Sequence, residues 1–150
     1  MDQLITAAAG FLIAVLWFEL MFDVQVFRHR RSPELPEPVL ASISSYYRRV
    51  TTTASPMGRL VGLVMLVLVA SLIWQAVDGE APAWTSAVSL PPACLAVGLA
   101  ILRVFGRARR LGARTDGMAV QSNLARSILR DHLICLAAMA VVLAVQIGGA

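Results

Sequence analysis

Charged residues are scarce in this chain, and their scarcity excludes an ordinary water-soluble globule. Only 15% of the 150 residues are charged, whereas 58% are hydrophobic. A soluble domain of this size cannot bury so much apolar surface inside itself, so the surplus is expected to face lipid. Lysine is missing altogether, so all 13 basic residues are arginine. We draw no function from that usage.

Cysteines and catalytic motifs are also sparse. Cys94 and Cys135 are expected at different depths in the membrane, which argues against a disulfide between them. No CxxC pair, phosphate-binding loop or Ser-His-Asp arrangement occurs, so no motif supports a soluble enzyme class. The initial MDQ has no basic residue, and the apolar run after it is too long for a secretory signal. The first helix is therefore expected to remain in the mature protein.

Four apolar runs are long enough to cross about 30 Å of hydrocarbon. These runs cover residues 4–27, 60–77, 84–105 and 132–148. They predict an all-α integral membrane four-helix bundle that forms a single domain over residues 1–150. The fourth run continues a polar helical pattern that begins near Met118, so one long helix is expected there. Pro91 and Pro92 are expected to kink or shorten the third helix.

The distribution of arginines predicts the orientation. They gather in the first and third connections, whereas the second connection, DGEAPAW, contains only Asp78 and Glu80. The positive-inside rule then places the first and third connections in the cytoplasm and both termini outside it. Because the arginines flank the apolar runs, they indicate topology rather than a nucleic-acid patch. We expect a multi-pass protein of the bacterial inner (plasma) membrane that contacts the lipid bilayer and no nucleic acid.

An amphipathic helix is expected between the first two spans. The RSPELPEP segment ends the first helix and prevents an immediate restart. Apolar and aromatic residues then recur at helical spacing: Val39, Leu40, Ile43, Tyr46, Tyr47 and Val50. Tyrosine and arginine beside apolar residues suit a helix in the membrane interface. The same pattern suits a cover packed on the inner mouth of the bundle, and both interpretations are kept.

Two acids in the first apolar run mark the candidate site. Glu19 and Asp23 lie on one helical face. That face is expected to point into the bundle, because an ionised acid facing lipid is costly. Since the first helix runs inward and the fourth outward, Asp131 and His132 are expected at a similar depth. Three arginines are expected near enough to pair with the acids: Arg30, Arg126 and Arg130.

Several chemical interpretations of this set stay open. An ion pair of Asp23 or Asp131 with an arginine would lock the first helix against the fourth, and we favour this interpretation. Carboxylates and imidazole also ligate transition metals, but no Glu-x-x-His motif occurs, so no metal is predicted. Glu19 could instead bind a proton for transport or relay, and His132 could ligate a haem. The cofactor is left open, and Glu19, Asp23 and His132 are the catalytic candidates.

Two polar segments carry a resemblance to a known group. They are the connection LPEPVLASISSYYRRVTTTASP and the approach to the last span, SNLARSILRDHL. In them the chain resembles small four-helix membrane proteins of the anthrone-oxygenase-like group, which includes bacterial domains of unknown function. The resemblance implies a four-helix bundle and, for some members, cofactor-independent oxidation of a polycyclic substrate. It implies a role for His132 with Arg126 and Arg130, whereas Glu19 and Asp23 stand outside the group's pattern.

Three functions follow as hypotheses. The first is a non-enzymatic accessory or assembly subunit of a larger membrane complex, or a homo-oligomer, because Ala140, Ala144 and Gly148 form a stripe that permits close helix contact. The second is a cofactor-binding or oxygenase-like membrane enzyme acting on a hydrophobic substrate. The third is a proton-coupled small carrier or channel that uses Glu19.

Overall fold

The fold is all-helical, as predicted. A computed structural model describes residues 2–52, 55–79 and 81–149, and no strand occurs within these ranges. The elements follow in chain order: α1 (Asp2–Asp23), the 3₁₀ helix η1 (Val24–His29), α2 (Glu37–Thr51), α3 (Ser55–Asp78), α4 (Ala83–Leu99), the π-helix η2 (Ala100–Val104), α5 (Phe105–Ala113) and α6 (Met118–Gly148). Apolar residues at helical spacing account for the four long helices.

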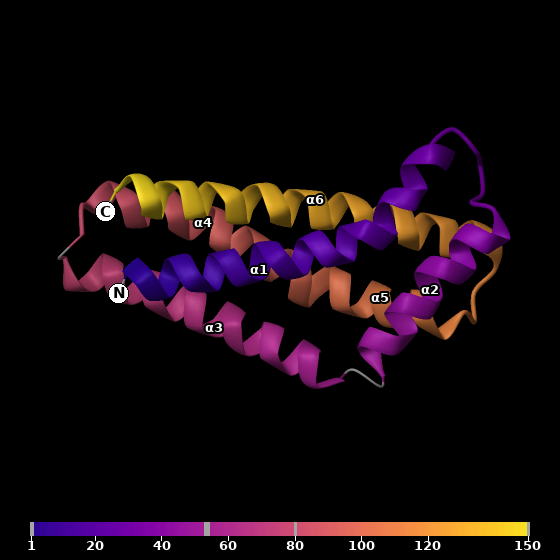
Figure 1. The fold of residues 1–150 in the computed structure, drawn as a ribbon, viewed down its shortest axis with the longest axis horizontal. Helices are drawn as coiled ribbons and strands as arrows, with labels where there is room; N and C mark the ends of the chain where they lie inside the picture. The colour runs from indigo at the N-terminus through magenta and orange to yellow at the C-terminus, as the bar shows by residue number, and fades with distance from the viewer. Residues whose placement is uncertain (1, 53–54, 80, 150) are drawn as a thin grey trace.

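The four long helices lie roughly along one axis (Figure 1). Their contacts close a ring. α1 packs against α3 and α6, and α4 packs against the same two helices. Four stretches are long and apolar enough to cross a membrane: Asp2–His29, Pro56–Asp78, Ala83–Ala113 and Met118–Gly148. Each contains one of the four predicted runs, so four helices of spanning length are confirmed. Both ends of the chain lie at the same end of the bundle.

The irregular part of the third long helix does not lie at its prolines. α4 passes through Pro91 and Pro92 and continues to Leu99, so the predicted shortening there is wrong. The change of helix type comes later, at η2, which carries Arg103 and Val104. A π turn is wider than an α turn and frequently accompanies a functional site. In this chain it lies beside the polar groups described below.

α2 lies against α5 at the end of the bundle opposite the termini (Figure 1). Pro38 stands in its first turn, where a backbone N–H has no hydrogen-bond partner within the helix, so the N–H that proline lacks is not needed. Leu40, Ile43 and Tyr47 are buried, as the predicted spacing requires. The cover on the bundle is therefore present in the structure. Contact of this helix with a membrane interface remains a proposal.

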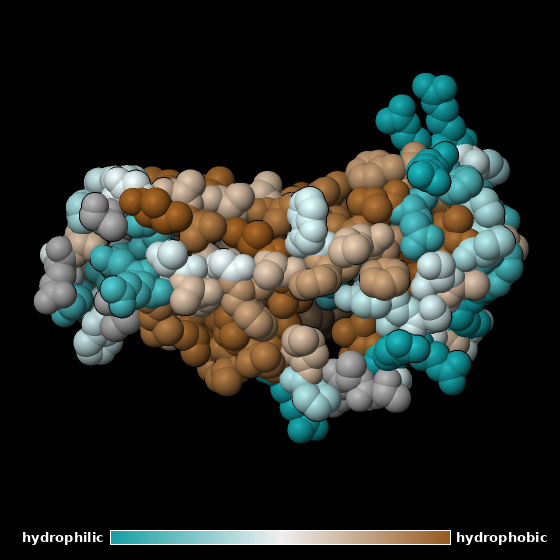
Figure 2. Space-filling model, in the orientation of Figure 1, coloured by the Kyte–Doolittle hydropathy of each residue, from teal (hydrophilic) through white to brown (hydrophobic). Residues whose placement is uncertain are grey.

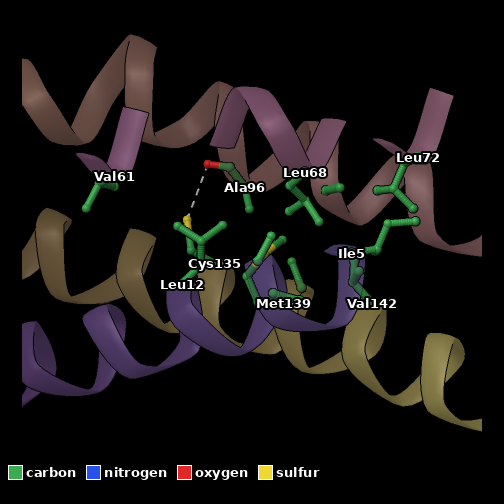
Figure 3. Close-up of a cluster of buried hydrophobic side chains, with 13 residues drawn as sticks. Ile5, Leu12, Val61, Leu68, Leu72, Ala96, Cys135, Met139 and Val142 are labelled. Carbon is green, nitrogen blue, oxygen red and sulfur yellow. Dashed lines mark hydrogen bonds between the residues drawn. The ribbon is translucent and has the colours of Figure 1, made fainter. Parts of the chain in front are cut away.

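The interior contains two apolar clusters along the bundle. The first joins the four long helices, and Figure 3 shows Leu12, Leu68, Ala96 and Cys135 among its side chains. The second gathers side chains from α1, α2, α5 and the first half of α6. Both cysteines are free, and Cys94 is exposed whereas Cys135 is buried. The candidate site lies where the two clusters meet.

Candidate functional site

Three elements bring four polar side chains together at this junction. α1 supplies Glu19 and Asp23, α2 supplies Tyr47, and α6 supplies His132. The Nδ1 atom of His132 lies 2.7 Å from Oδ2 of Asp23, and its Nε2 atom lies 3.1 Å from Oε2 of Glu19. The Tyr47 hydroxyl donates to the Asp23 carboxylate, at 2.8 Å from Oδ1 and 3.0 Å from Oδ2. The imidazole thus bridges the two acids of α1.

The four groups differ in their access to the outside. Asp23 is 0% exposed and His132 2%, whereas the Glu19 side chain keeps 22%. Each nitrogen–oxygen contact of the imidazole needs a proton, because neither a bare ring nitrogen nor a carboxylate is a donor. The group therefore holds either an imidazolium between two carboxylates or a neutral imidazole beside a protonated acid. Of the two acids, Glu19 is the one that is partly exposed.

The tyrosines around the acids remain protonated. Burial raises the pKa of Tyr47 well above its ordinary value, and the negative charges of Asp23 and Glu19 raise it further. Burial and the same two charges also raise the pKa of Tyr46. Tyr46 stacks on Phe22 with ring centroids 4.1 Å apart. Tyr47 therefore stays a hydrogen-bond donor to Asp23, and Tyr46 stays a neutral wall residue.

Glu19 also lines two adjoining cavities. The smaller, of about 50 Å³, is lined by His132 and by residues of all four long helices. The larger is a groove of about 530 Å³ between α1, α2, α3 and α5, and it includes the hollow near the ends of α2 and α3 in Figure 2. Several residues line both spaces: Val15, Glu19, Val61, Val104 and Phe105. We call the larger space the Glu19 groove.

Asp131 belongs to a separate ionic group. Its carboxylate is fully buried and lies 3.3 Å from Nε of Arg103, 2.8 Å from Nη1 of Arg107 and 3.3 Å from Nη2 of Arg130. Arg107 also donates to the hydroxyl of Ser127. An arginine pair of Asp131 was predicted as a lock between the first and fourth spans. Its main partners instead come from the third span, and the lock between α1 and α6 is made by Asp23 with His132.

Arg30 and Arg126 lie away from the acids. Arg30 is exposed just after η1. Arg126 donates to the backbone carbonyls of Ser32, at 2.5 Å, and Pro33, at 3.1 Å, and so ties the first connection to α6. Of the predicted residues, the structure brings together Glu19, Asp23 and His132. It places Arg130 and Asp131 in the neighbouring ionic group.

Three contributors were not predicted: Tyr47, Arg103 and Arg107. Tyr47 follows Leu40 and Ile43 on the predicted buried face of α2, and this spacing was a usable signal. The two arginines stand four residues apart, which places them on one side of a helix. They were interpreted only as a topology signal, because their partner lies on a different span.

A second polar network closes the opposite end of the bundle. Nε2 of Gln75 lies 2.7 Å from Oδ1 of Asp2 and 3.0 Å from Oε1 of Gln146. Gln146 donates to Ser89 at 3.1 Å, and Ser86 donates to Gln75 at 3.2 Å. These residues come from all four long helices. The network fixes the helices relative to one another at the end that carries the termini.

The geometry defines a class rather than a named family. No family model, curated protein or solved structure matches the chain. Among the described residues, no group of three or more His, Cys, Asp or Glu side chains is placed to hold a metal ion. The class is an all-helical bundle with four helices of membrane-spanning length and a buried His–carboxylate–tyrosine group beside an apolar groove. The resemblance to the anthrone-oxygenase-like group stays a prediction.

Proposed function

We propose that the protein is a membrane enzyme that binds an apolar small molecule in the Glu19 groove and exchanges a proton with it through Glu19. The main support is that the Glu19 carboxyl belongs both to the polar group and to the cavity walls. It contacts His132 at 3.1 Å and also lines both cavities. An acid that connects a proton-holding group to a ligand cavity is suited to general acid–base catalysis.

Membrane insertion is supported by the outer surface of the long helices. Large apolar side chains are exposed on each of them, for example Trp17, Leu66, Leu102 and Ile147. Figure 2 shows a broad apolar middle with hydrophilic side chains toward both ends. We place the protein in the bacterial inner membrane with both termini outside the cytoplasm. α2 and α5 then lie at the cytoplasmic interface.

The site then falls near the inner edge of the hydrocarbon layer. At 1.5 Å per residue, Glu19 lies about 26 Å along α1 from Asp2, against a layer of about 30 Å. The Glu19 groove would therefore be reachable from the lipid and from the cytoplasmic interface. A ligand that dissolves in the bilayer can enter such a space without crossing water.

The size and the lining of the Glu19 groove indicate the class of ligand. Its volume of about 530 Å³ is within the usual range of small-molecule sites. Val15, Phe18 and Val61 provide apolar walls, and Glu19 and Tyr46 provide polar groups. An apolar ring compound with one acidic hydrogen fits these walls and this acid. The same chemistry is what the resemblance implies, since removal of a proton from a polycyclic substrate creates a carbanion that can react with oxygen.

The remaining members of the site support proton transfer by Glu19. Tyr47 donates to the Asp23 carboxylate and fixes its position. Asp23 in turn lies 2.7 Å from Nδ1 of His132, where a carboxylate can accept the ring proton. The imidazole can therefore accept the proton that Glu19 has taken and return it later. Asp23 and Tyr47 are positioning residues in this proposal.

Deuterium exchange into anthrone tests the proposal, because anthrone is an apolar tricycle with an acidic methylene group. The wild-type protein in mild detergent and D₂O should accelerate exchange at this methylene, measured by NMR. Glu19→Gln should lower the exchange rate roughly a hundredfold or more. Its binding of anthrone, measured by equilibrium dialysis, should stay the same. Glu34→Gln, which changes an exposed acid of the first connection, should leave both unchanged.

A second variant tests the location. Val61 is 8% exposed and lines both cavities, so Val61→Phe should fill the space and abolish binding of anthrone. Equal exchange rates in the wild type and Glu19→Gln would overturn the acid–base role. Unchanged binding in Val61→Phe would move the ligand out of the Glu19 groove.

The accessory-subunit and carrier hypotheses remain predictions. Ala140, Ala144 and Gly148 are exposed on α6, so a partner helix or a second copy could pack there. Native mass spectrometry of the purified protein tests that idea, and a persistent monomer without a partner would argue against it. Equal proton flux in vesicles with wild type and Glu19→Gln would argue against a carrier.

A further inference from the structure

Three arginines surround one buried carboxylate on the side of the bundle formed by α4, η2, α5 and α6. We infer that Arg103, Arg107 and Arg130 form a binding site for the phosphate group of an anionic phospholipid, with Asp131 holding them in place. The inference rests only on the membrane location in the proposed function. It does not depend on the Glu19 groove or on proton transfer.

The charges of this group do not cancel. Three guanidinium groups meet one carboxylate, which leaves a local charge of +2. The side chain of Asp131 is 0% exposed, whereas those of Arg103, Arg107 and Arg130 are 37%, 30% and 61% exposed. The negative charge of Asp131 is therefore shielded from the surface, whereas the positive charges of the three arginines reach the surface. An anion approaching from outside meets arginines.

Asp131 also orients these arginines. Its Oδ2 atom binds Arg103 and Arg107, and its Oδ1 atom binds Arg130. A guanidinium has five N–H groups, and the contacts of Arg107 with Asp131 and Ser127 both use Nη1. Donors remain on each arginine for a second oxyanion. Phosphate is the anion that arginines bind through paired N–H donors.

The depth of the cluster matches that of lipid phosphates. Arg103 lies about 30 Å along the third long helix from Ala83, and Asp131 about 26 Å from Gly148, at 1.5 Å per residue. Both distances are close to the hydrocarbon thickness of about 30 Å. The arginines would therefore stand where the inner leaflet has its headgroups. Basic pockets between spanning helices on the cytoplasmic side bind anionic lipids in this way.

The neighbouring side chains favour a lipid over free phosphate. Leu102 is 83% exposed and Ile101 57%, next to Arg103, while Leu133 and Ile134 of α6 are 38% and 37% exposed. These apolar side chains can contact acyl chains below the headgroup. Free phosphate would gain nothing from them. The site is accordingly assigned to a phospholipid.

Native mass spectrometry of the full chain provides the test. The protein is released from nanodiscs of equal phosphatidylglycerol and phosphatidylcholine with matched acyl chains. We expect retention of phosphatidylglycerol by the wild type. The double variant Arg103→Gln/Arg130→Gln should weaken that retention roughly thirtyfold. It keeps Arg107 on Asp131 and Ser127, and an unchanged melting temperature in detergent checks that it folds.

Two further variants separate a lipid site from general charge or a structural role. Arg28→Gln/Arg31→Gln loses the same charge from exposed positions of the first connection and should retain the lipid. Asp131→Asn keeps the three arginines but removes the carboxylate that orients them, so a folded Asp131→Asn protein should retain less lipid than the wild type and more than Arg103→Gln/Arg130→Gln. Equal loss of lipid in the two double variants would overturn the inference. Displacement of the lipid by millimolar inorganic phosphate would overturn the choice of a phospholipid.

Discussion

His132 joins two acids of α1, and Tyr47 adds a third element to the same group, so this cluster holds three helices together at one point. Asp23 accepts from Tyr47 and lies 2.7 Å from Nδ1 of His132. Its replacement by alanine leaves two buried polar groups without their partner. Asp23→Ala is expected to lower the free energy of unfolding by about 3–5 kcal/mol. Unfolding in mixed micelles with increasing dodecyl sulfate measures the change.

A matched control uses an acid in a surface ion pair. Asp116 lies 2.7 Å from Nη2 of Arg110 in the connection that leads to α6. Exposed ion pairs contribute little to stability, so Asp116→Ala should leave the free energy of unfolding almost unchanged. If the two variants lost similar stability, Asp23 would have no special role in joining the helices.

Tyrosine ionisation gives a pH-dependent prediction. The chain has two tyrosines, and the pKa of each is raised by burial and nearby acids. Absorbance near 295 nm should therefore show no tyrosinate around pH 10 in the folded protein, and full ionisation there after unfolding. The folded state holds these protons more tightly than the unfolded state. The stability that the two tyrosines contribute to the folded state is therefore fully present below pH 10 and decreases as the pH rises above 10.

A control separates the two phenols. The Tyr46→Phe variant retains Tyr47, whose hydroxyl is bonded to Asp23. This tyrosine should ionise at a pH at least as high as the tyrosines of the wild type. Ionisation of Tyr47 at its ordinary pKa in that folded variant would contradict the buried contact with Asp23.

The residues of the site differed in how visible they were in the sequence. Glu19 and Asp23 could be predicted because acids in a long apolar run are costly unless they face the interior. His132 followed from the antiparallel order of the first and last spans. The contact of Tyr47 with Asp23 depends on the angle at which α2 meets the bundle, and no local pattern determines that angle.

At the scale of elements, the contact between α2 and α5 depends on one glycine. A Cβ at Gly112 would lie 2.7 Å from the backbone nitrogen of Arg48. Gly112→Ala should push α2 away and lower the melting temperature by several degrees or more, since neither backbone can move aside alone. It should also weaken binding in the Glu19 groove, because α2 forms one wall.

Gly106 offers a control in the same helix. A Cβ at Gly106 would meet no atom within 4 Å, so Gly106→Ala should leave the melting temperature unchanged or raise it slightly through better helix propensity. Equal effects of the two substitutions would show that the close approach of α2 and α5 does not contribute to stability.

The helices themselves were predictable to different degrees. The buried spacing of α2 was visible because apolar residues recur at 3.6-residue intervals. The change to a π turn at η2 was not, since nothing in AILRV marks it. The prolines of α4 did not shorten it, contrary to one of the two predicted effects. Pro91 and Pro92 stand side by side within a helix whose other turns are supported on both sides by α3 and α6.

At the scale of the whole molecule, the four long apolar runs were enough to predict most of the fold. Four successive spans alternate in direction, so the first and the fourth are antiparallel, and this order brought the acids of α1 to the level of His132. The Glu19 groove was not predictable in this way. It exists because α2 covers only part of its end of the bundle and leaves a space beside α1, α3 and α5.

Topology is the whole-molecule prediction that the arginines make. Single cysteines at Asp78, beside the second connection, and at Ser45, on the exposed side of α2, can be introduced after replacing Cys94 and Cys135 by alanine. A membrane-impermeant maleimide should label Asp78→Cys in intact bacterial cells and Ser45→Cys only after permeabilisation. Gln3→Cys serves as the control, because α1 begins at the end of the bundle where α3 finishes (Figure 1), so it must follow Asp78→Cys. The reverse pattern would place the arginine-rich end outside the cell, where the inner-leaflet lipid site could not form. Labelling of all three positions in intact cells would show that the four helices do not separate two compartments.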